Sequence, residues 1–420
     1  MSSSTPDTVY PLSAVRRLAL HAQSLLAPLD PSRDSALDHL YEVVKQLGCV
    51  QIDTLQMVQR SHYLVLWSRL GRYDPADFDR LVYDPQQRRL FEGWQHAACI
   101  IPLEDYRFQM PHQKRLLENG SDWYKDWQNQ PGNLELMQTV LEQIRQDGGL
   151  RANAFEYNGP RRGSWWDWKP AKVALEYLWT AGDLMISNRV NFQRIYDLTE
   201  RVLPTWVNID EPSTAERDRY WVEQGARALG ICGPIQAADY SQRKRNQARP
   251  VVEELISRDV LIPVRANLAD GEIHTLIVHQ DNLPLLQRAA DGELEPRRTT
   301  FLSPFDNLFW ARGRDMQLWN FHHVLEAYKP GQDRIWGYYC MPILHGDRLV
   351  GRFDPKLERK TATLRLKNLY LEPGVEPDDE LVQAVAQAMV DFLAFHSATN
   401  LVIERSDPPG LAGRLMAYLG

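Results

Sequence analysis

Apolar residues along the chain fall into two patterns, one with the period of a helix and one with the alternation of a strand. In the middle of the sequence they recur near positions i, i+3, i+4 and i+7, which predicts helices, and alternating runs follow around a tight turn at Asn191. Gly182, after the second helix, suits a C-terminal cap. The predicted helices and strands are Leu134–Gln146, Pro170–Thr180, Leu184–Val190 and Phe192–Leu198. Helices followed by a hairpin indicate a winged helix over residues 131–212.

The same plan recurs on both sides of this region. After it, three helices lead into two strands joined by Asp270-Gly271, a dipeptide typical of hairpin turns. These elements are Glu216–Leu229, Ile235–Tyr240, Pro250–Arg258, Asp259–Arg265 and Glu272–Val278. Before it, a looser version is predicted: helices Leu12–Leu26 and Ser35–Leu47, strand Val50–Ile52 and helix Thr54–Arg69. We therefore expect three tandem winged-helix units, over residues 1–130, 131–212 and 213–300.

The last part of the chain, residues 301–420, has a different pattern. It contains one long predicted helix, Glu380–Phe395, among strand-like runs. The runs are Arg334–Leu344, Arg348–Asp354, Thr361–Tyr370 and Leu401–Glu404. This mixture predicts a small β-rich C-terminal domain with a terminal helix. The fold class expected for the whole chain is therefore α+β and mainly helical.

The most informative residues are an amide and a carboxylate at the end of the predicted strand Val50–Ile52. Side chains alternate along a strand, so Gln51 and Asp53 are expected to point the same way while Ile52 points into the core. A carboxylate beside an amide can hold and activate one water molecule. A second interpretation is structural, because Asp53 followed three residues later by Gln56 fits the capping pattern of a helix start. The residues alone leave both roles open.

Charge is distributed unevenly, although the chain as a whole is acidic. Lys and Arg total 48 and Asp and Glu total 55, a net charge of −7, which argues against a protein that merely coats DNA. Phosphate contacts need only a local basic face, however. Two runs are candidates for such a face: Arg161 and Arg162, and Arg243, Lys244 and Arg245 at the start of a predicted helix. A solvated charged surface is the alternative interpretation of each run.

Other features narrow the class of protein. Cys49, Cys99, Cys232 and Cys340 are far apart and form no Cys-x-x-Cys pair, which argues against a zinc site or disulfide framework and favours a reducing cytosol. The start of the chain is polar, and no apolar run approaches the roughly 20 residues needed to cross a bilayer. Motifs of zinc proteases, phosphate loops and dinucleotide-binding folds are missing. We expect a cytoplasmic protein with no metal, no cofactor and no membrane partner.

Several longer motifs resemble one known family. They follow one another in order over nearly the whole chain: Gln51–Thr54, Arg60–Arg69, Glu92–Ala98, Ser303–Leu308 and Pro342–Arg352. The chain resembles the winged-helix DNA glycosylases of the AlkZ and YcaQ type, the latter also called AlkX. The resemblance implies tandem winged helices around a DNA-binding cleft, excision of alkylated purines and unhooking of interstrand crosslinks. The family's catalytic motif is Gln-apolar-Gln in one branch and Gln-apolar-Asp in the other, so Gln51-Ile52-Asp53 implies the YcaQ-like branch.

The resemblance also implies roles for particular residues. Asp53 is the expected general base of a monofunctional glycosylase, and Gln51 is expected to orient the attacking water. Four further residues are candidates for DNA contact, with pairing to acids or a structural role as the alternative: Arg60, His62, Arg69 and His96. The expected partner is duplex DNA that contains alkylated bases or crosslinks, bound by a monomer.

Two other classes of protein remain open. A winged-helix transcription regulator needs the same helices and hairpins but not the Gln-x-Asp pair, and it usually carries a dimerisation element. No heptad run predicts such an element here. A protein that recognises DNA damage without cutting differs from an enzyme only in what Asp53 does.

Overall fold

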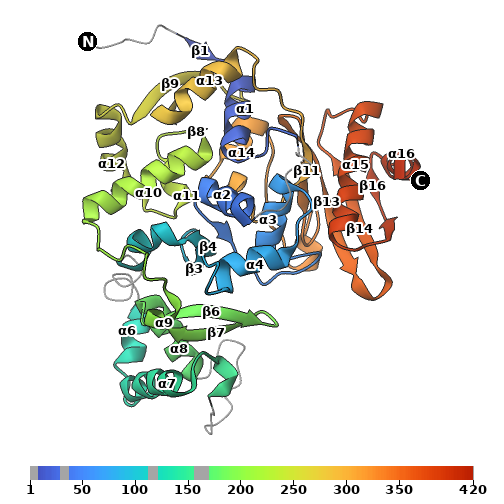
Figure 1. The fold of residues 1–420 in the computed structure, drawn as a ribbon. Coiled ribbons are helices and arrows are strands. Elements are labelled where there is room, and N and C mark those ends of the chain that lie inside the picture. The colour runs from blue at the N-terminus through green and yellow to red at the C-terminus, as the bar shows by residue number, and fades with distance from the viewer. Residues whose placement is uncertain (1–7, 29–36, 112–121, 156–169, 420) are drawn as a thin grey trace. The chain divides into compact units, whose positions relative to one another are not determined.

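A computed structural model describes residues 8–28, 37–111, 122–155 and 170–419 (Figure 1). The chain forms two compact units: a first unit of Met1–Pro75 together with Asp218–Gly420, and a second unit of Ala76–Arg217. This division differs from the four consecutive segments expected from the sequence. The difference arises because the beginning of the chain packs with residues that follow Asp218, so no boundary separates them.

The first elements of the first unit lead to Gln51. They are β1 (Val9–Tyr10), α1 (Leu12–Ala22), α2 (Leu37–Leu47), β2 (Val50–Gln51) and α3 (Ser61–Leu70). The helices α1 and α2 and the strand β2 lie where the sequence predicted them, although α1 ends earlier than Leu26. The prediction that the next helix begins at Thr54 is wrong, since α3 begins at Ser61.

The elements after Asp218 join those at the N-terminus in one core. In chain order they are α10 (Thr214–Leu229), β8 (Ile231–Cys232), α11 (Gln236–Tyr240), α12 (Arg245–Ser257), β9 (Leu261–Asn267), β10 (Ile273–His279) and α13 (Leu283–Ala290). β1 pairs in parallel with β9, which gives a sheet of order β1-β9-β10-β8. Leu18 of α1 is fully buried in the same apolar cluster as Leu286 of α13. The predicted helices and hairpin of this region are confirmed, with α12 beginning at Arg245 rather than Pro250.

The C-terminal part of the first unit is built on a six-stranded sheet. Its elements are β11 (Thr299–Phe301), α14 (Arg314–Trp319), β12 (Met341–His345), β13 (Arg348–Glu358), β14 (Thr363–Leu371), α15 (Asp379–Phe395), β15 (Asn400–Ile403), β16 (Ser406–Asp407) and α16 (Leu411–Leu419). The order is β11-β12-β13-β14-β15, and β16 also pairs with β14. α15 lies beside this sheet (Figure 1).

An aromatic cluster joins this sheet to α3. The ring of Trp67 on α3 lies 4.9 Å from that of Phe392 on α15, and Phe301 on β11 lies 5.5 Å from Phe392. Large aromatic rings bury much apolar area, so the sheet is part of the core of the first unit.

The strand predicted over Arg334–Leu344 begins only at Met341. The preceding amides bond to buried carboxylates and not to a neighbouring strand. Tyr338 and Tyr339 each donate a backbone N–H to Asp354, both at 2.9 Å. Because each amide has one proton to donate, these bonds replace the ladder that would extend the strand.

The second unit contains three groups of elements in the described residues. They are α4 (Pro75–Tyr83) with β3 (Leu90–Trp94) and β4 (Ala98–Pro102); α6 (Asp122–Gln128), α7 (Asn133–Asp147) and β5 (Leu150–Arg151); and α8 (Pro170–Ala181), β6 (Leu184–Val190), β7 (Gln193–Leu198) and α9 (Thr199–Val202). The predicted helices α7 and α8 and the hairpin β6–β7 are confirmed. Glu92 on β3 is buried and pairs with Arg189 on β6 at 2.6 Å. This ion pair fixes the β3–β4 hairpin to the β6–β7 hairpin.

Among the described helices, none combines the length and the apolar character that crossing a membrane would require.

Candidate active site

Gln51 and Asp53 lie where β2 ends and a loop begins. Residues 52–60, called here the Asp53 loop, contain no helix. The Asp53 carboxylate accepts a hydrogen bond at Oδ1 from the backbone N–H of Leu55, at 2.8 Å. This local turn is one that aspartate side chains commonly form with the amide two residues later. Both Gln51 and Asp53 are half-buried, so solvent and a ligand can reach them.

The helix-capping interpretation of Asp53 is wrong. The residue that precedes α3 is Arg60, and no side chain caps this helix end. Asp53 holds the start of a loop and lies well before the helix. The structure thus removes the helix-capping role that the sequence left open for this carboxylate, and leaves it the turn with Leu55.

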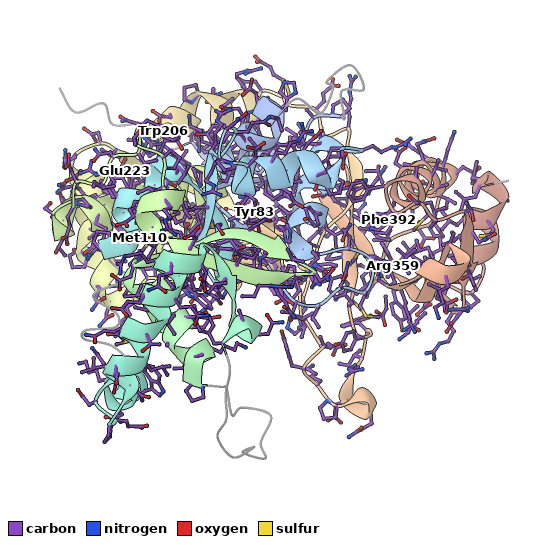
Figure 2. All side chains as sticks on the ribbon, turned by 60° about the horizontal axis from the view of Figure 1, so that its bottom comes forward. Tyr83, Met110, Trp206, Glu223, Arg359 and Phe392 are labelled. Atoms are coloured by element: carbon purple, nitrogen blue, oxygen red, sulfur yellow. The ribbon has the colours of Figure 1, made fainter. Side chains whose placement is uncertain are left out.

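Bonds from distant residues keep the Asp53 loop in this conformation. The backbone N–H of Leu357 on β13 donates to the carbonyl of Met57 at 2.8 Å, and the Arg359 guanidinium donates to the carbonyl of Val58 at 2.6 Å. Arg359 is labelled in Figure 2, just beyond the end of β13. The Ser61 hydroxyl donates to the Gln51 carbonyl at 2.6 Å, which connects the loop's two ends. Tertiary bonds therefore outweigh the local preference for helix.

The environment of Asp53 increases its basicity. Burial raises the pKa of Asp53 above its ordinary value, and the amides of Leu55 and Thr54 and the charge of Arg60 oppose this only in part. A carboxylate that is partly removed from water holds a proton more tightly, which is the property that a general base needs.

The strand that carries Gln51 rests on a buried polar chain. The Asn307 side-chain amide donates to the carbonyl of Cys49 at 2.9 Å and to the hydroxyl of Tyr240 at 2.8 Å. That hydroxyl in turn donates to the carbonyl of Leu47 at 2.7 Å. These bonds fix the backbone immediately before Gln51. They give Asn307, in the Ser303–Leu308 segment, a structural role.

Arg69 is not available to DNA. Its guanidinium is fully buried and forms an ion pair with Asp306, including a bond from Nη2 to Oδ1 at 2.8 Å. Of the two roles predicted for Arg69, pairing with an acid is confirmed. The prediction that Arg69 contacts DNA is wrong, because its guanidinium is buried. Asp306 lies 237 residues away in the sequence, so the local pattern around Arg69 could not identify it as the partner.

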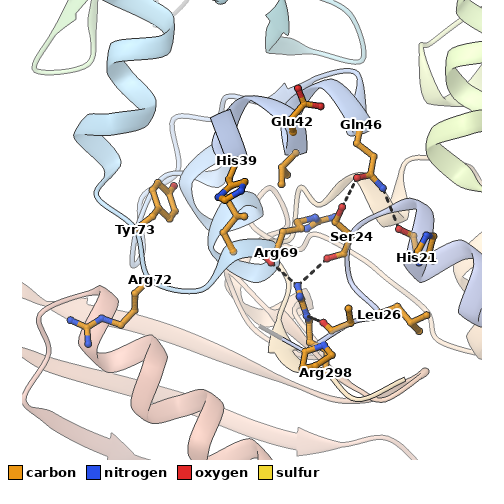
Figure 3. A pocket seen from close by; sticks show the side chains of 14 residues that line it. His21, Ser24, Leu26, His39, Glu42, Gln46, Arg69, Arg72, Tyr73 and Arg298 are labelled. Atoms are coloured by element: carbon orange, nitrogen blue, oxygen red, sulfur yellow. Dashed lines mark hydrogen bonds between the residues drawn. The ribbon is translucent and has the colours of Figure 1, made fainter. Parts of the chain in front are cut away.

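Figure 3 shows Arg69 and Arg298 in the wall of a cavity of about 480 Å³. Arg298 donates to the carbonyls of Ser24, Ala27 and Arg69, at 2.9, 2.6 and 2.8 Å. Burial and the neighbouring charge of Arg69 lower the pKa of Arg298 to about 10. These donors of Arg298 are satisfied by backbone carbonyls. The lining of the cavity does not include Gln51 or Asp53.

The three other residues predicted to contact DNA in this part of the chain, Arg60, His62 and His96, lie in different environments. The Arg60 guanidinium donates to the carbonyl of Thr54 at 2.7 Å, so it supports the Asp53 loop from within. His62 is buried on α3, which makes it a structural residue and corrects its assignment as a DNA contact. His96 is half-buried in the turn between β3 and β4 of the second unit, beside the exposed Trp94.

The basic run before α12 is only partly paired. Arg243 lies over the ring of Trp221, with its Cζ atom 5.0 Å from the ring centroid. Lys244 is exposed at the N-cap of α12, and Arg245 donates to the buried Asp239 at 2.8 Å. Lys244 therefore offers its charge to solvent, whereas Arg245 shares its charge with an acid. Arg161 and Arg162 lie outside the described residues.

Two tyrosines influenced by the charge of Asp53 were not among the candidate residues chosen from the sequence. The charge of Asp53 adds to burial in raising the pKa of both Tyr328 and Tyr339. Tyr339 is fully buried, whereas Tyr328 is 75% exposed. No local signal could have found them, because this influence depends on how distant segments pack.

Comparison with known proteins identifies the class to which this fold and site belong. Residues 44–395 match the model of the DNA glycosylase AlkZ-like family, and this range contains Gln51 and Asp53. The chain belongs to the AlkZ-like DNA glycosylases, enzymes of DNA repair whose partner is DNA. It is also similar to a solved structure, the DNA glycosylase AlkZ from Streptomyces sahachiroi, with a TM-score of 0.63. That similarity covers 95% of this chain and 100% of that one at 15% identity, and concerns the fold.

Proposed function

We propose that this protein hydrolyses the N-glycosidic bond of N7-alkylated purines in duplex DNA and unhooks interstrand crosslinks formed through such bases. In this proposal Asp53 activates the attacking water and Gln51 positions it. The observation that carries the proposal is the Asp53 carboxylate: it is half-exposed, made more basic by burial, and held at Oδ1 by the Leu55 amide rather than used as a helix cap.

The chemistry of the substrate explains why few groups are needed. A purine alkylated at N7 carries a positive charge, so it leaves the sugar readily without a strong general acid. The remaining tasks are to stabilise an oxocarbenium-like sugar and to deliver water, as carboxylates do in glycoside hydrolysis. Asp53 can do both, because its negative charge faces the developing cation and its basicity assists deprotonation of the water. The Gln51 amide can donate to and accept from the same water.

Crosslinked substrates add a geometric requirement. A base tied to the opposite strand cannot rotate by about 180° into a closed pocket, as many base-modifying enzymes require. We therefore propose an open site in which Gln51 and Asp53 reach the sugar from a groove of the duplex. The partial exposure of both residues supports this.

We further propose that three winged helices form the DNA-binding framework. The order α10, β8, α11, α12, β9 and β10 supports one such unit, with α12 in the position of a recognition helix. Its hairpin turn carries Asp270 and Glu272, both exposed acids, so phosphate contact should fall to the N-terminal end of α12 and not to this turn.

Lys244→Ala is expected to weaken binding to any duplex and to reduce the slope of log affinity against log salt by about 1. Arg245→Ala should change that slope much less, because its guanidinium already pairs with Asp239. The measurement is fluorescence anisotropy with undamaged duplex over a range of salt concentrations. Equal slopes for wild type and Lys244→Ala would remove α12 from the proposed DNA interface.

The rate of excision is expected to fall at acid pH because only the ionised Asp53 is a base. Since burial raises the pKa of Asp53, this fall should be centred above the ordinary aspartate value of 3.8. Below that pKa the logarithm of the rate should decrease with a slope of one, and above it the rate should be level. Single-turnover rates on duplex with 7-methylguanine, corrected for spontaneous depurination, measure the profile. A profile unchanged in Asp53→Asn would assign the acidic limb to another group.

A further inference from the structure

The turn of the β6–β7 hairpin has a backbone conformation that one of its residues does not favour. Asn191 and Phe192 have positive φ angles, of 50° and 64°, between the paired residues Val190 and Gln193. A two-residue turn with two positive φ angles is of type I′, for which Asn-Gly is a preferred sequence. Asparagine tolerates this region, whereas a bulky side chain such as that of Phe192 is unfavourable there. Contacts from outside the turn must therefore hold Phe192 in place.

Arg189 supplies these contacts. Its Nη1 donates to the carbonyl of Phe192 at 2.8 Å, and its Cζ atom lies 4.2 Å from the centroid of the Phe192 ring. The guanidinium is itself fixed by the buried Glu92, through bonds of 2.6 Å from Nε to Oε1 and 2.7 Å from Nη2 to Oε2. A continuous set of contacts thus leads from a buried carboxylate through Arg189 to Phe192 and holds the turn in one conformation.

The tip of this hairpin presents apolar and amide groups and no acid. Val190 is 40% exposed, Asn191 and Gln193 are exposed, and Phe192 is half-buried. No Asp or Glu occurs between positions 187 and 196 of the sequence. In Figure 1 the tip projects beyond α8 of the same unit. Nothing in this stretch of sequence would therefore repel a polyanion from the tip.

The arginines of the hairpin are not free to bind phosphate. Arg189 pairs with Glu92, and Arg194 donates to the buried Glu176 at 2.9 Å. The groups left for a ligand are amides and apolar side chains. Proteins use these groups in the minor groove of DNA, where Asn and Gln contact base edges and apolar residues form wedges at base steps. The family to which the chain belongs acts on DNA, so DNA is the partner to consider.

We propose that the tip of the β6–β7 hairpin enters the minor groove of duplex DNA, with Phe192 and Val190 as an apolar wedge at a base step. This inference rests on the DNA-binding part of the proposed function. The N7 atom of a purine lies in the major groove, and so does an adduct or crosslink attached to it. A wedge from the minor groove therefore meets no obstacle from the lesion. Opening a base step from that side also requires no rotation of the crosslinked base.

The variant Phe192→Gly separates a structural role from contact with DNA. It removes the ring and gives the turn its preferred Asn-Gly sequence, so the urea midpoint should not fall. Affinity for undamaged duplex, measured by fluorescence anisotropy, should nevertheless fall by about 10- to 150-fold, the loss expected when a phenylalanine is no longer buried on binding. Phe192→Leu should recover most of that loss, because leucine also serves as a wedge.

A second pair of variants compares two hairpins of the chain. Val190→Ala removes two methyl groups and should weaken binding by up to about 15-fold. Its matched control is Ile273→Ala, which shortens a residue 48% exposed beside the β9–β10 turn, where Asp270 and Glu272 are exposed acids. The control should bind as tightly as wild type. An equal loss in both variants would overturn the assignment of the wedge to the β6–β7 hairpin.

Two further readouts test the groove and the wedge without catalysis. Netropsin, which occupies the minor groove of A·T-rich duplex, should compete with wild type and much less with Phe192→Gly. A duplex that contains 2-aminopurine should become more fluorescent when wild type opens a base step beside it, and Phe192→Gly at saturation should not produce this increase. Wild-type binding that netropsin leaves unchanged would overturn the minor-groove placement.

The outcomes separate the inference from the proposed function. If wild type excises 7-methylguanine and Phe192→Gly binds duplex as tightly as wild type, the wedge is overturned and the proposed function stands. If wild type excises nothing while Phe192→Gly loses affinity, the glycosylase activity is overturned and the wedge stands as a DNA contact. A lower urea midpoint in Phe192→Gly, with an equal loss of binding in Phe192→Leu, would assign the effect to the shape of the hairpin and overturn the wedge.

Discussion

Asp53→Asn is expected to lower the single-turnover rate of 7-methylguanine excision, and of unhooking an N7–N7 crosslink, by about 100-fold or more. The asparagine keeps the shape of the side chain and an oxygen that can accept the Leu55 N–H, so the Asp53 loop should be preserved. In the proposed mechanism it removes the negative charge that faces the sugar and the base that accepts the proton of the water. The measurement is rapid-quench excision with enzyme in excess over duplex.

Binding and folding provide the controls for this variant. DNA affinity should be equal or slightly higher, because the proposed site loses a negative charge that would repel the phosphates. Stability should not fall: burial raises the pKa of Asp53, so the folded protein disfavours the ionised form, and removing the charge relieves that cost at neutral pH. Asp291→Asn, at the end of α13, is the matched control for loss of one carboxylate and should excise normally.

The result distinguishes the remaining classes of protein. Product from wild type and not from Asp53→Asn supports a glycosylase with Asp53 at its centre. If both proteins bind the duplex and neither releases a base, a regulator or a damage-recognition protein becomes the better explanation. Normal excision by a well-folded Asp53→Asn would contradict the proposed mechanism while leaving the membership of the family unchanged.

Local pattern was sufficient to predict the strand that carries Gln51 and several elements of the second unit. Alternation at Val50–Ile52 predicted β2, and period and turn residues predicted α7, α8 and the β6–β7 hairpin. These features depend on neighbours in sequence, because side-chain period and turn chemistry are local properties. The order of motifs likewise indicated the family.

Predictions that failed did so where distant residues decide the conformation. The helix expected from Thr54 does not form, because Leu357 and Arg359 bond to the carbonyls of the Asp53 loop. The N-terminal unit is not separate, because β1 completes the sheet of β9. The influence of Asp53 on Tyr328 was missed for the same reason. Pairing between residues far apart in sequence carries no local signal, so the surroundings of the catalytic candidates could not be derived from the motif alone.

Asp306→Asn is expected to destabilise the first unit strongly, by about 3–5 kcal/mol, because it leaves the Arg69 guanidinium buried without a counter-charge. An exposed pair such as Arg288 and Glu293 supplies the comparison, and Glu293→Gln should cost less than about 1 kcal/mol. The measurement is the shift in the urea midpoint, followed by tryptophan fluorescence. A chain with two units can unfold in more than one step, so each transition is fitted separately.

The double variant Arg69→Met with Asp306→Asn tests whether the lone charge is the cause. Removing both charges should restore much of the lost stability, since methionine fills similar apolar volume and needs no partner. A double variant as unstable as Asp306→Asn would show that the uncompensated charge is not the cause. Asp306 Oδ1 also accepts the Leu308 N–H at 3.0 Å, a bond that an asparagine oxygen can keep. That bond starts the turn carrying Asn307, which fixes Cys49 ahead of Gln51. Excision measured at urea concentrations well below the unfolding transition then shows whether the buried pair supports only the fold or also the position of the strand that carries Gln51.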